Sequence, residues 1–330
     1  MKAVYSSIAV AAIAALGLVP GQAPGLRLLF GVIVPYAAIA LFLVGVACRV
    51  IGWARVPVPF RIPVTCGQEK SLPWIKAASL DNPSTLLGVT GRMALEILLF
   101  RSLFRNTSSE LRTGPRLLYG EEKLLWLGAI AFHWSFLVIF LRHLRFFLEP
   151  VPRLVLALQS LDGFFQVGTP ELYITDVVIL AALLYLLGRR LGTPRIRYFS
   201  LFTDYFALFL LIGLALSGVV MRYFVRVDLL SIKQFAMGLI TFSPVIPAGI
   251  GAAFFVHLIL LSALLAYFPF SKLVHMGGVF LSPTRNLSNN NRMSRHVNPW
   301  NYPVKLHTYE EWEAEFHDKI VAAGLPLDKE

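Results

Sequence analysis

The sequence predicts an all-α integral membrane protein, a bundle of about six transmembrane helices with polar segments between and after them. Of its 330 residues, 56% are hydrophobic and only 15% are charged, and the mean hydropathy is +0.66. A soluble domain carries about 25% charged residues. The charged residues also cluster between long apolar runs. The bilayer must therefore supply much of the burial that this chain needs.

Six apolar runs approach the ~20 residues that a membrane-spanning helix requires. They cover residues 3–19, 28–50, 124–147, 172–191, 205–224 and 249–270. The first run follows Lys2 and precedes PGQAPG, a pattern that resembles a cleavable signal peptide. We favour its retention as an anchor, because the chain enters a second span at once. The predicted parts are an extra N-terminal segment (1–26), a membrane domain (27–276) and a polar tail (277–330).

A long polar loop, residues 52–123, separates the second and third runs. Within it, the stretch LLGVTGRMALEILLFRSLF (86–104) is apolar but contains Arg92, Glu96 and Arg101. These charges argue against a span, and we expect a helix that lies at the membrane interface or against a partner.

Loop charge predicts the orientation, because Lys and Arg favour the cytoplasmic side of a prokaryotic cell membrane. The loop 52–123 holds ten Lys or Arg, and the short connection GRRLGTPRIR holds four Arg and no acid. Both lie on one side in a six-span arrangement, so this side, the N-terminus and the tail are expected to be cytoplasmic. The same loops account for much of the net charge of +11. Membrane lipid is therefore an expected partner, and nucleic acid is not.

The cysteines and the tail carry no chemistry of their own in this interpretation. Cys48 and Cys66 form no C-x-x-C motif, which excludes an iron–sulfur cluster held by this chain alone. In the tail, Thr308 and Glu311 have the spacing of a helix capping box. We expect the tail to lie as a strap on a partner subunit. The tail histidines are His296, His307 and His317, which we interpret as surface residues.

Four other histidines, His133, His143, His257 and His275, lie in or beside the third and sixth runs. An ionisable residue inside a membrane is costly and is a functional candidate by default. On a helix, the first two are ~15 Å apart along the axis and the second two ~27 Å. Because the two spans are antiparallel, His143 should pair with His257 near the outer face, and His133 with His275 near the inner face.

Each pair would bring two imidazoles from different helices to one depth, which is the arrangement that holds a flat macrocycle by two axial ligands. We therefore predict two haem b groups, one above the other, that carry electrons across the membrane. Arg142 and Arg145 are candidates to neutralise haem propionates, or alternatively to contact lipid headgroups. The two spacings differ by ~12 Å, and a kink at Pro269 would absorb part of that difference.

The four-histidine pattern resembles the di-haem cytochrome b gamma-subunit family of respiratory nitrate reductase, over residues 28–276. The resemblance implies a gamma-subunit-like core, the four histidines as haem ligands, and menaquinone or menaquinol as the redox partner. It also places quinol oxidation near the outer haem. The ionisable residues at that level include Arg153, Asp176 and Arg222. Asp176 is the candidate acceptor of a quinol proton, and its alternative role is a salt bridge to a nearby arginine.

Two further stretches, VPVPFRIPVTCGQEKSLPWI and RHVNPWNYP, are similar to the family of cytochrome b subunits of the sulfite-reductase-linked membrane complex (DsrM). This similarity implies a cytoplasmic, heterodisulfide-reductase-like iron–sulfur subunit and other membrane subunits as partners, in dissimilatory sulfur metabolism. The alternatives are a gamma-type cytochrome b of another quinol-linked reductase, a proton transporter with a histidine relay, and a membrane anchor with interhelical histidine bonds.

Overall fold

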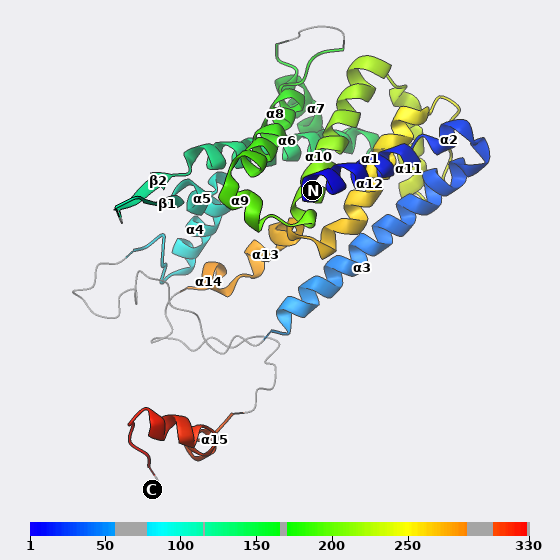
Figure 1. Cartoon of the computed structure of the whole chain (residues 1–330). Coiled ribbons are helices and arrows are strands. Elements are labelled where there is room, and N and C mark those ends of the chain that lie inside the picture. Colours follow the sequence, from blue (N-terminus) through cyan, green and yellow to red (C-terminus); the bar gives the residue numbers. More distant parts are fainter. Residues whose placement is uncertain (57–77, 115, 166–169, 289–305, 329–330) are drawn as a thin grey trace.

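The computed structural model describes residues 1–56, 78–114, 116–165, 170–288 and 306–328, and it confirms the all-α membrane class (Figure 1). The elements are α1 (Lys2–Leu16), α2 (Val19–Gln22), η1 (Pro24–Leu26), η2 (Leu29–Ile33), α3 (Val34–Ala54), α4 (Leu86–Leu99), α5 (Arg101–Phe104), β1 (Thr107–Arg112), β2 (Arg116–Glu121), α6 (Lys123–His143), η3 (Leu144–Phe146), α7 (Arg153–Asp162), α8 (Ile174–Gly192), α9 (Pro194–Phe199), α10 (Phe202–Val219), η4 (Val220–Val225), α11 (Leu229–Ile240), α12 (Ala252–Tyr267), η5 (Phe268–Phe270), η6 (Lys272–Val274), α13 (His275–Leu281), α14 (Pro283–Asn286) and α15 (Tyr309–Ala322). Of these, η2 and η4 are π-helical and the other η elements are 3₁₀ turns. Cys66, His296 and nearly all of the two stretches 56–75 and 295–303 lie outside the described residues.

Five helical stretches are long and apolar enough to cross a membrane, by length and composition, in the described part of the chain. They are Lys2–Gln22, Pro24–Ala54, Lys123–Phe146, Phe202–Val225 and Ala252–Phe270. The remaining predicted span is α8, whose 19 residues carry Asp176 in the first turn and Arg189 and Arg190 in the last. The charges of α8 thus lie at its two ends. It packs against α6 and α10, and together with the five stretches above it makes up the six predicted helices of the bundle.

The first helix, α1, packs along α10 and α12. The ammonium group of Lys2 donates to the carbonyl of Ser200 at 3.0 Å, and the hydroxyl of Ser6 donates to the carbonyl of Phe202 at 2.9 Å. Behind these bonds, Val10 joins a buried cluster with Leu210, Leu260 and Leu264. A methyl group added at Gly17, just after α1, would meet the Cα of Val256 in α12 at 2.4 Å. The chain therefore requires a glycine where the first helix approaches α12.

We expect Gly17→Ala to lower the thermal unfolding midpoint of the detergent-purified protein. The added methyl group cannot fit against the α12 backbone, and overpacking of this kind costs about 1–3 kcal/mol. The matched control is Gly25→Ala, because nothing lies within 4 Å of the methyl group at that position. Equal midpoints for the two variants would contradict the close packing of α1.

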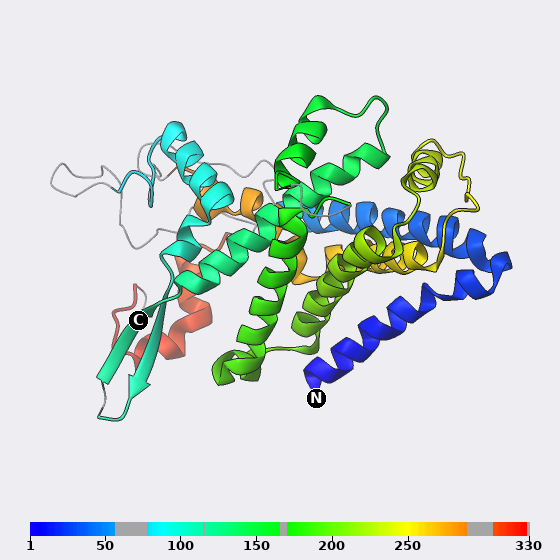
Figure 2. The ribbon, with the colours of Figure 1, turned by 90° about the horizontal axis from the view of Figure 1, so that it is seen from above.

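The region expected to be a loop, 52–123, contains regular structure from α4 onward. Helix α4 is 14 residues long and buries Arg92 and Glu96, of which Glu96 pairs with Arg285 at 3.2 Å. An antiparallel hairpin follows, with register from Thr107↔Glu121 to Arg112↔Arg116. The sequence analysis did not predict these strands. The residues of β2 are all exposed and lack the buried alternation of a packed sheet. Figures 1 and 2 both show the hairpin extending away from the helical bundle.

Candidate functional site

The four histidines of the third and sixth predicted spans meet in two pairs. The ring centres of His143 and His257 lie 6.4 Å apart, with an angle of 7° between the ring planes. Those of His133 and His275 lie 5.9 Å apart, with an angle of 80°. Helix α6 runs unbroken through both His133 and His143, so the two pairs are ~15 Å apart along its axis.

The helix that carries His257 ends before His275, whereas the ~27 Å spacing was calculated for one continuous helix. Helix α12 ends at Tyr267, the 3₁₀ turn Phe268–Phe270 contains Pro269, and Ser271 is extended with φ −110° and ψ 174°. Proline has no N–H to continue the helical bonds, which explains a break at this point. His275 then begins the separate helix α13. The break removes the assumption behind the predicted 27 Å spacing, because the chain between the two histidines is not straight.

One nitrogen of each ring is fixed by a hydrogen bond to its own surroundings. The Nδ1 atoms of His133, His143 and His275 lie 2.7–2.8 Å from the carbonyls of Ala129, Ile139 and Lys272, and Nδ1 of His257 lies 2.9 Å from the hydroxyl of Ser217. The Ser217 hydroxyl also donates to the carbonyl of Leu214 at 2.9 Å. Each Nδ1 therefore carries the proton, and the Nε2 lone pair is left for a ligand.

The geometry of the pairs fits two imidazoles on opposite sides of one metal atom. Metal–imidazole bonds are about 2 Å long, so two such rings on a line have centres about 6.3 Å apart. The rings are also reachable: His133 and His257 are half-buried, and His143 and His275 are exposed. Among the described residues, no three or more His, Cys, Asp or Glu gather into a metal-binding group. A metal at either pair would thus take two imidazole ligands from the described residues, an arrangement that suits a metal already held in a planar macrocycle.

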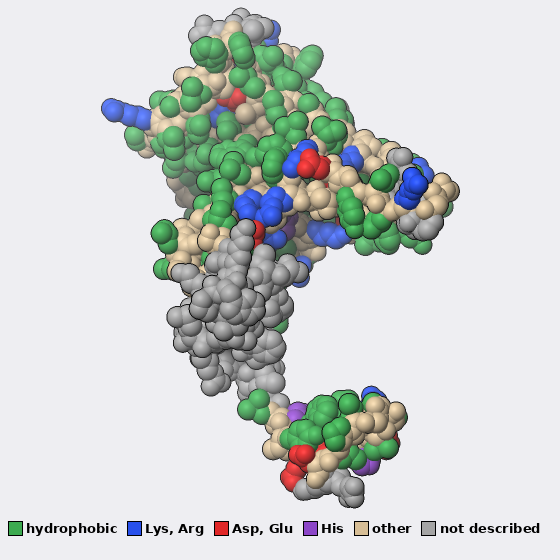
Figure 3. Space-filling view, turned by 90° about the vertical axis from the view of Figure 1, so that its left-hand side faces the viewer, with side chains coloured by type: hydrophobic (Ala, Val, Ile, Leu, Met, Phe, Trp, Pro, Cys, Tyr) green, Lys and Arg blue, Asp and Glu red, His purple; other side chains and the backbone are tan. Residues whose placement is uncertain are grey.

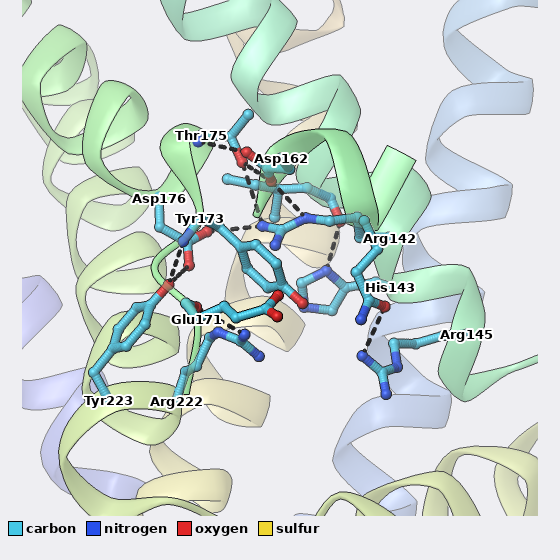
Figure 4. A network of polar contacts seen from close by, with 12 residues as sticks. Arg142, His143, Arg145, Asp162, Glu171, Tyr173, Thr175, Asp176, Arg222 and Tyr223 are labelled. Atoms are coloured by element: carbon cyan, nitrogen blue, oxygen red, sulfur yellow. Dashed lines mark hydrogen bonds and ion pairs between the residues drawn. The ribbon is translucent and has the colours of Figure 1, made fainter. Parts of the chain in front are cut away.

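Next to the His143–His257 pair lies an ionic network that joins α6, α7 and α8 (Figure 4). Arg142, only 7% exposed, contacts Asp162 at 3.1 Å through Nε and Asp176 at 2.8 Å through Nη2. Asp162 also accepts from the N–H and hydroxyl of Thr175 at 2.8 and 2.6 Å. The Tyr223 hydroxyl donates to Asp176 at 2.8 Å. The buried carboxylate of Asp162, the half-buried carboxylate of Asp176 and a buried guanidinium thus pair with one another beside His143.

The aromatic ring of Tyr173 forms the second part of this network. The guanidinium carbons of Arg142 and Arg222 each lie 3.8 Å from the centre of that ring, which is a cation–π distance. Arg222 also donates to the carbonyl of Glu171 at 3.0 Å. Arg222 and Tyr223 belong to the π-helical turn η4, and such turns are frequent at functional sites.

The structure brings three of the predicted outer residues, Arg142, Asp176 and Arg222, into this network, and it places the other two elsewhere. Arg145 donates to the amide oxygen of Gln159 at 3.0 Å, and Arg153 is exposed at the start of α7. The sequence analysis missed Asp162, Tyr173 and Tyr223. Asp162 could have been found in the sequence as the single acid of an amphipathic helix, directly before the glycine that follows the helix, Gly163.

The His133–His275 pair has a different support, made by the junction of α4 and α5 with α6. The indole N–H groups of Trp126 and Trp134 donate to the last carbonyls of α4, those of Leu99 and Leu98, at 2.7 and 3.1 Å. The next residue, Phe100, has a left-handed backbone with φ 51°, and its ring centre lies 4.9 Å from that of His133. These indole bonds satisfy carbonyls that a helix end leaves unpaired, and they hold Phe100 against the His133 ring.

A salt-bridged acid fixes the start of this junction outside the spans. Asp81 contacts Arg101 at 2.5 Å and Arg105 at 2.7 Å. The hydrogen bond from Arg101, aided by that from Arg105, lowers the pKa of Asp81 to about 2. Asp81 therefore remains charged at neutral pH. Its ion pairs connect the segment before α4 to α5 and the residue after it.

Fold and site together define an integral membrane helical bundle with two stacked histidine pairs. Residues 86–296 match the family described as nitrate reductase gamma subunit, and the chain belongs to that family. The matched range contains all four paired histidines and the ionic network.

Two relatives cover most of the chain. An "Hdr-like menaquinol oxidoreductase cytochrome b-like subunit" of Archaeoglobus fulgidus is 48% identical over 279 residues, which are 82% of this chain and 83% of the relative. A protein of the same name from Archaeoglobus profundus is 41% identical over 273 residues, 81% of each chain. The predicted similarity to the gamma-subunit family is confirmed. The finer similarity to the sulfite-reductase-linked family stays a prediction.

Proposed function

We propose that this protein is the membrane cytochrome b subunit of a quinol-linked oxidoreductase complex, with two haem b groups. The observation that carries the proposal is the pairing of four histidines whose Nδ1 atoms are already engaged. A ligating histidine normally donates its other ring N–H to a nearby acceptor, which fixes the ring and its tautomer. The printed names of the two relatives support the same role.

In this proposal, His143 and His257 hold the outer haem, and His133 and His275 hold the inner one. Haem held by these histidines would supply one-electron transfer chemistry. The protein side supplies orientation: Ser217 fixes the His257 ring, and Phe100 packs against the His133 ring. Arg145 remains the candidate for a haem propionate. Arg142 is engaged by two carboxylates, so we assign it to holding the network instead.

We place menaquinol oxidation beside the outer pair. Asp176 is the proposed proton acceptor, because its carboxylate is bound by Arg142 and Tyr223 next to His143. Arg222 packs on Tyr173 and is assigned to the wall of this region, whereas Arg153, exposed on α7, is assigned no direct contact. Electrons would pass from the outer to the inner haem, or in reverse, according to the potentials of the partners.

The proposed partners lie on the cytoplasmic side, where the basic loops, the N-terminus and the tail are expected. The described part of the chain has no cysteine cluster, so we propose a heterodisulfide-reductase-like iron–sulfur subunit as the exchange partner. Other membrane subunits, and a role in dissimilatory sulfur metabolism, complete the proposal.

The test is a reduced-minus-oxidised spectrum of the purified chain, with haem-to-protein and iron-to-protein ratios, before and after a menaquinol analogue is added. We expect two b-type haems per chain, of which the analogue reduces at least the outer one. Well-folded protein without haem would overturn the proposal and favour a histidine relay or a membrane anchor. If haem is present but the analogue does not reduce it, the cytochrome assignment stands and the assignment of quinol as electron donor is wrong.

Ser217→Ala is expected to weaken retention of the outer haem about 10–100-fold, as loss of such supporting bonds does for bound metals. The variant leaves His257 in place but removes the partner of its Nδ1. Haem release during dialysis against apomyoglobin measures the effect. The matched control is Ser262→Ala, a buried serine of α12 whose hydroxyl bonds only the carbonyl of Leu258, at 2.8 Å. Equal release from both variants would show that the Ser217 bond does not support the ligand.

A further inference from the structure

A basic cavity of about 400 Å³ lies at the end of the bundle where α8 passes through α9 into α10. The site described above does not use it. Its lining combines cations, a hydroxyl and apolar side chains: Arg190, Arg195, Ile196, Phe199, Ser200, Asp204 and Lys272. This is the end of the bundle that the loop charges assign to the cytoplasm.

The charges of the cavity leave an excess of two positive charges, since three cations face one carboxylate. Asp204 contacts Lys272 at 2.8 Å and Arg190 at 3.8 Å, and it also accepts from the N–H of Leu201 at 2.9 Å. Arg195 has a single hydrogen bond, at 3.4 Å to the carbonyl of Ser109, and no carboxylate within 4.0 Å among the described residues. The cavity is therefore built to receive a further anion.

The rim places the cavity at the depth of lipid headgroups. The apolar stretch Phe202–Val225 begins directly after it. Tyr198 and Phe199, in α9, are 79% and 73% exposed. Exposed aromatic side chains of this kind concentrate at the membrane–water interface. Figure 3 shows hydrophobic side chains over much of the surface of the helical body, with Lys and Arg in small groups among them.

We propose that this cavity binds the phosphate of an anionic phospholipid headgroup. Arg195 and Arg190 would donate to the phosphate oxygens, a geometry that suits the planar guanidinium, and Lys272 would add a third cation. Phe199 and Ile196 would contact the glycerol and the first part of the acyl chains. Basic pockets between transmembrane helices on the cytoplasmic side take anionic lipids by this chemistry. A soluble anion would gain nothing from the exposed aromatic rim, which is why a lipid is the favoured source of the phosphate.

The experiment measures retention of phosphatidylglycerol and phosphatidylcholine by the full chain, using native mass spectrometry after reconstitution with each lipid. We expect one tightly held phosphatidylglycerol and no comparable phosphatidylcholine. Arg195→Gln should weaken retention about fivefold, and Arg195→Gln with Lys272→Gln about 25-fold, since each cation near the surface contributes a factor of about five. The matched control is Arg197→Gln, which removes an exposed arginine of the same helix that does not line the cavity.

Three outcomes would overturn the proposal. Equal loss in the Arg195 and Arg197 variants would show a diffuse surface attraction. Because both lipids carry a phosphate, equal retention of the two would show a contact that does not select for a headgroup of net negative charge. Displacement of phosphatidylglycerol by excess inorganic phosphate would identify a free-anion site. Haem content and circular dichroism of each variant separate these outcomes from misfolding, and loss of the lipid leaves the cytochrome assignment untouched.

Discussion

His143→Ala is expected to lower the haem content of the purified protein from two per chain to one. The outer site needs both rings of the pair, whose centres are 6.4 Å apart, and an alanine supplies no ligand. The inner pair lies ~15 Å away along α6, so it should keep its haem. A pyridine haemochrome assay with an iron-to-protein ratio measures the loss. Reduction by a menaquinol analogue should also be lost, because the proposed entry point for electrons is the outer haem.

The complementary variant and a neutral one make this result specific. His133→Ala should remove the other haem and leave the outer one reducible by quinol. His317→Ala changes an exposed histidine of the tail helix α15 and should retain both haems. Haem content that stays the same in all three variants would mean that the paired rings serve interhelical contact only. Loss of both haems in either single variant, in protein that remains folded, would mean that the two sites are not independent.

Arg142→Leu is expected to destabilise the protein by about 3–5 kcal/mol, the usual cost of removing one partner from a buried ion pair. The buried Asp162 and the half-buried Asp176, 3.1 and 2.8 Å from the guanidinium, would lose the cation that pairs with both. The Tyr173 ring would also lose one of the two guanidinium groups packed on it. Thermal unfolding in detergent, followed together with haem release, measures the effect.

Arg153→Leu is the comparison for that measurement, because it removes an exposed arginine at the start of α7 and should change the stability by about 0.5 kcal/mol or less. Arg142→Leu combined with Asp162→Asn and Asp176→Asn should recover part of the lost stability, because the unpaired carboxylates are gone. A triple variant no more stable than Arg142→Leu would indicate that the guanidinium acts through packing, and that charge balance is secondary.

The pairing of the histidines could be predicted from the sequence because the depth of a residue in the bilayer follows from its position along a spanning helix. Once the third and sixth runs are antiparallel, residue number converts to depth, and His143 can only approach His257. The break at Pro269 limited this arithmetic for His275, since residue counts assume an unbroken helix. The ionic network was less accessible. Asp162 reaches Arg142 from a short helix between spans, and Tyr223 faces Asp176 from a π-helical turn whose register differs from the 3.6-residue repeat.

The sequence analysis missed the hairpin and the basic cavity for a related reason. Two exposed strands outside a larger sheet have no buried face to impose alternation, so polarity alone predicts a loop. The cavity gathers Arg190, Arg195 and Lys272 from segments that only the tertiary fold brings together. The sequence analysis used Arg190 and Arg195 only to predict the membrane orientation, an argument that counts charges in a loop and does not depend on where each side chain lies.

The place of α1 in the bundle bears on the order in which the protein assembles. It precedes α10 and α12 in the chain, and its anchoring bonds reach Ser200 and Phe202, 198 and 196 residues further along. Insertion of separate helices, followed by their association within the bilayer, accommodates such distant contacts. Helix α1 must therefore be stable in contact with lipid alone until α10 and α12 have been synthesised and can pack against it. The apolar, almost uncharged surface of α1, which made it resemble a signal peptide, makes it stable in contact with lipid.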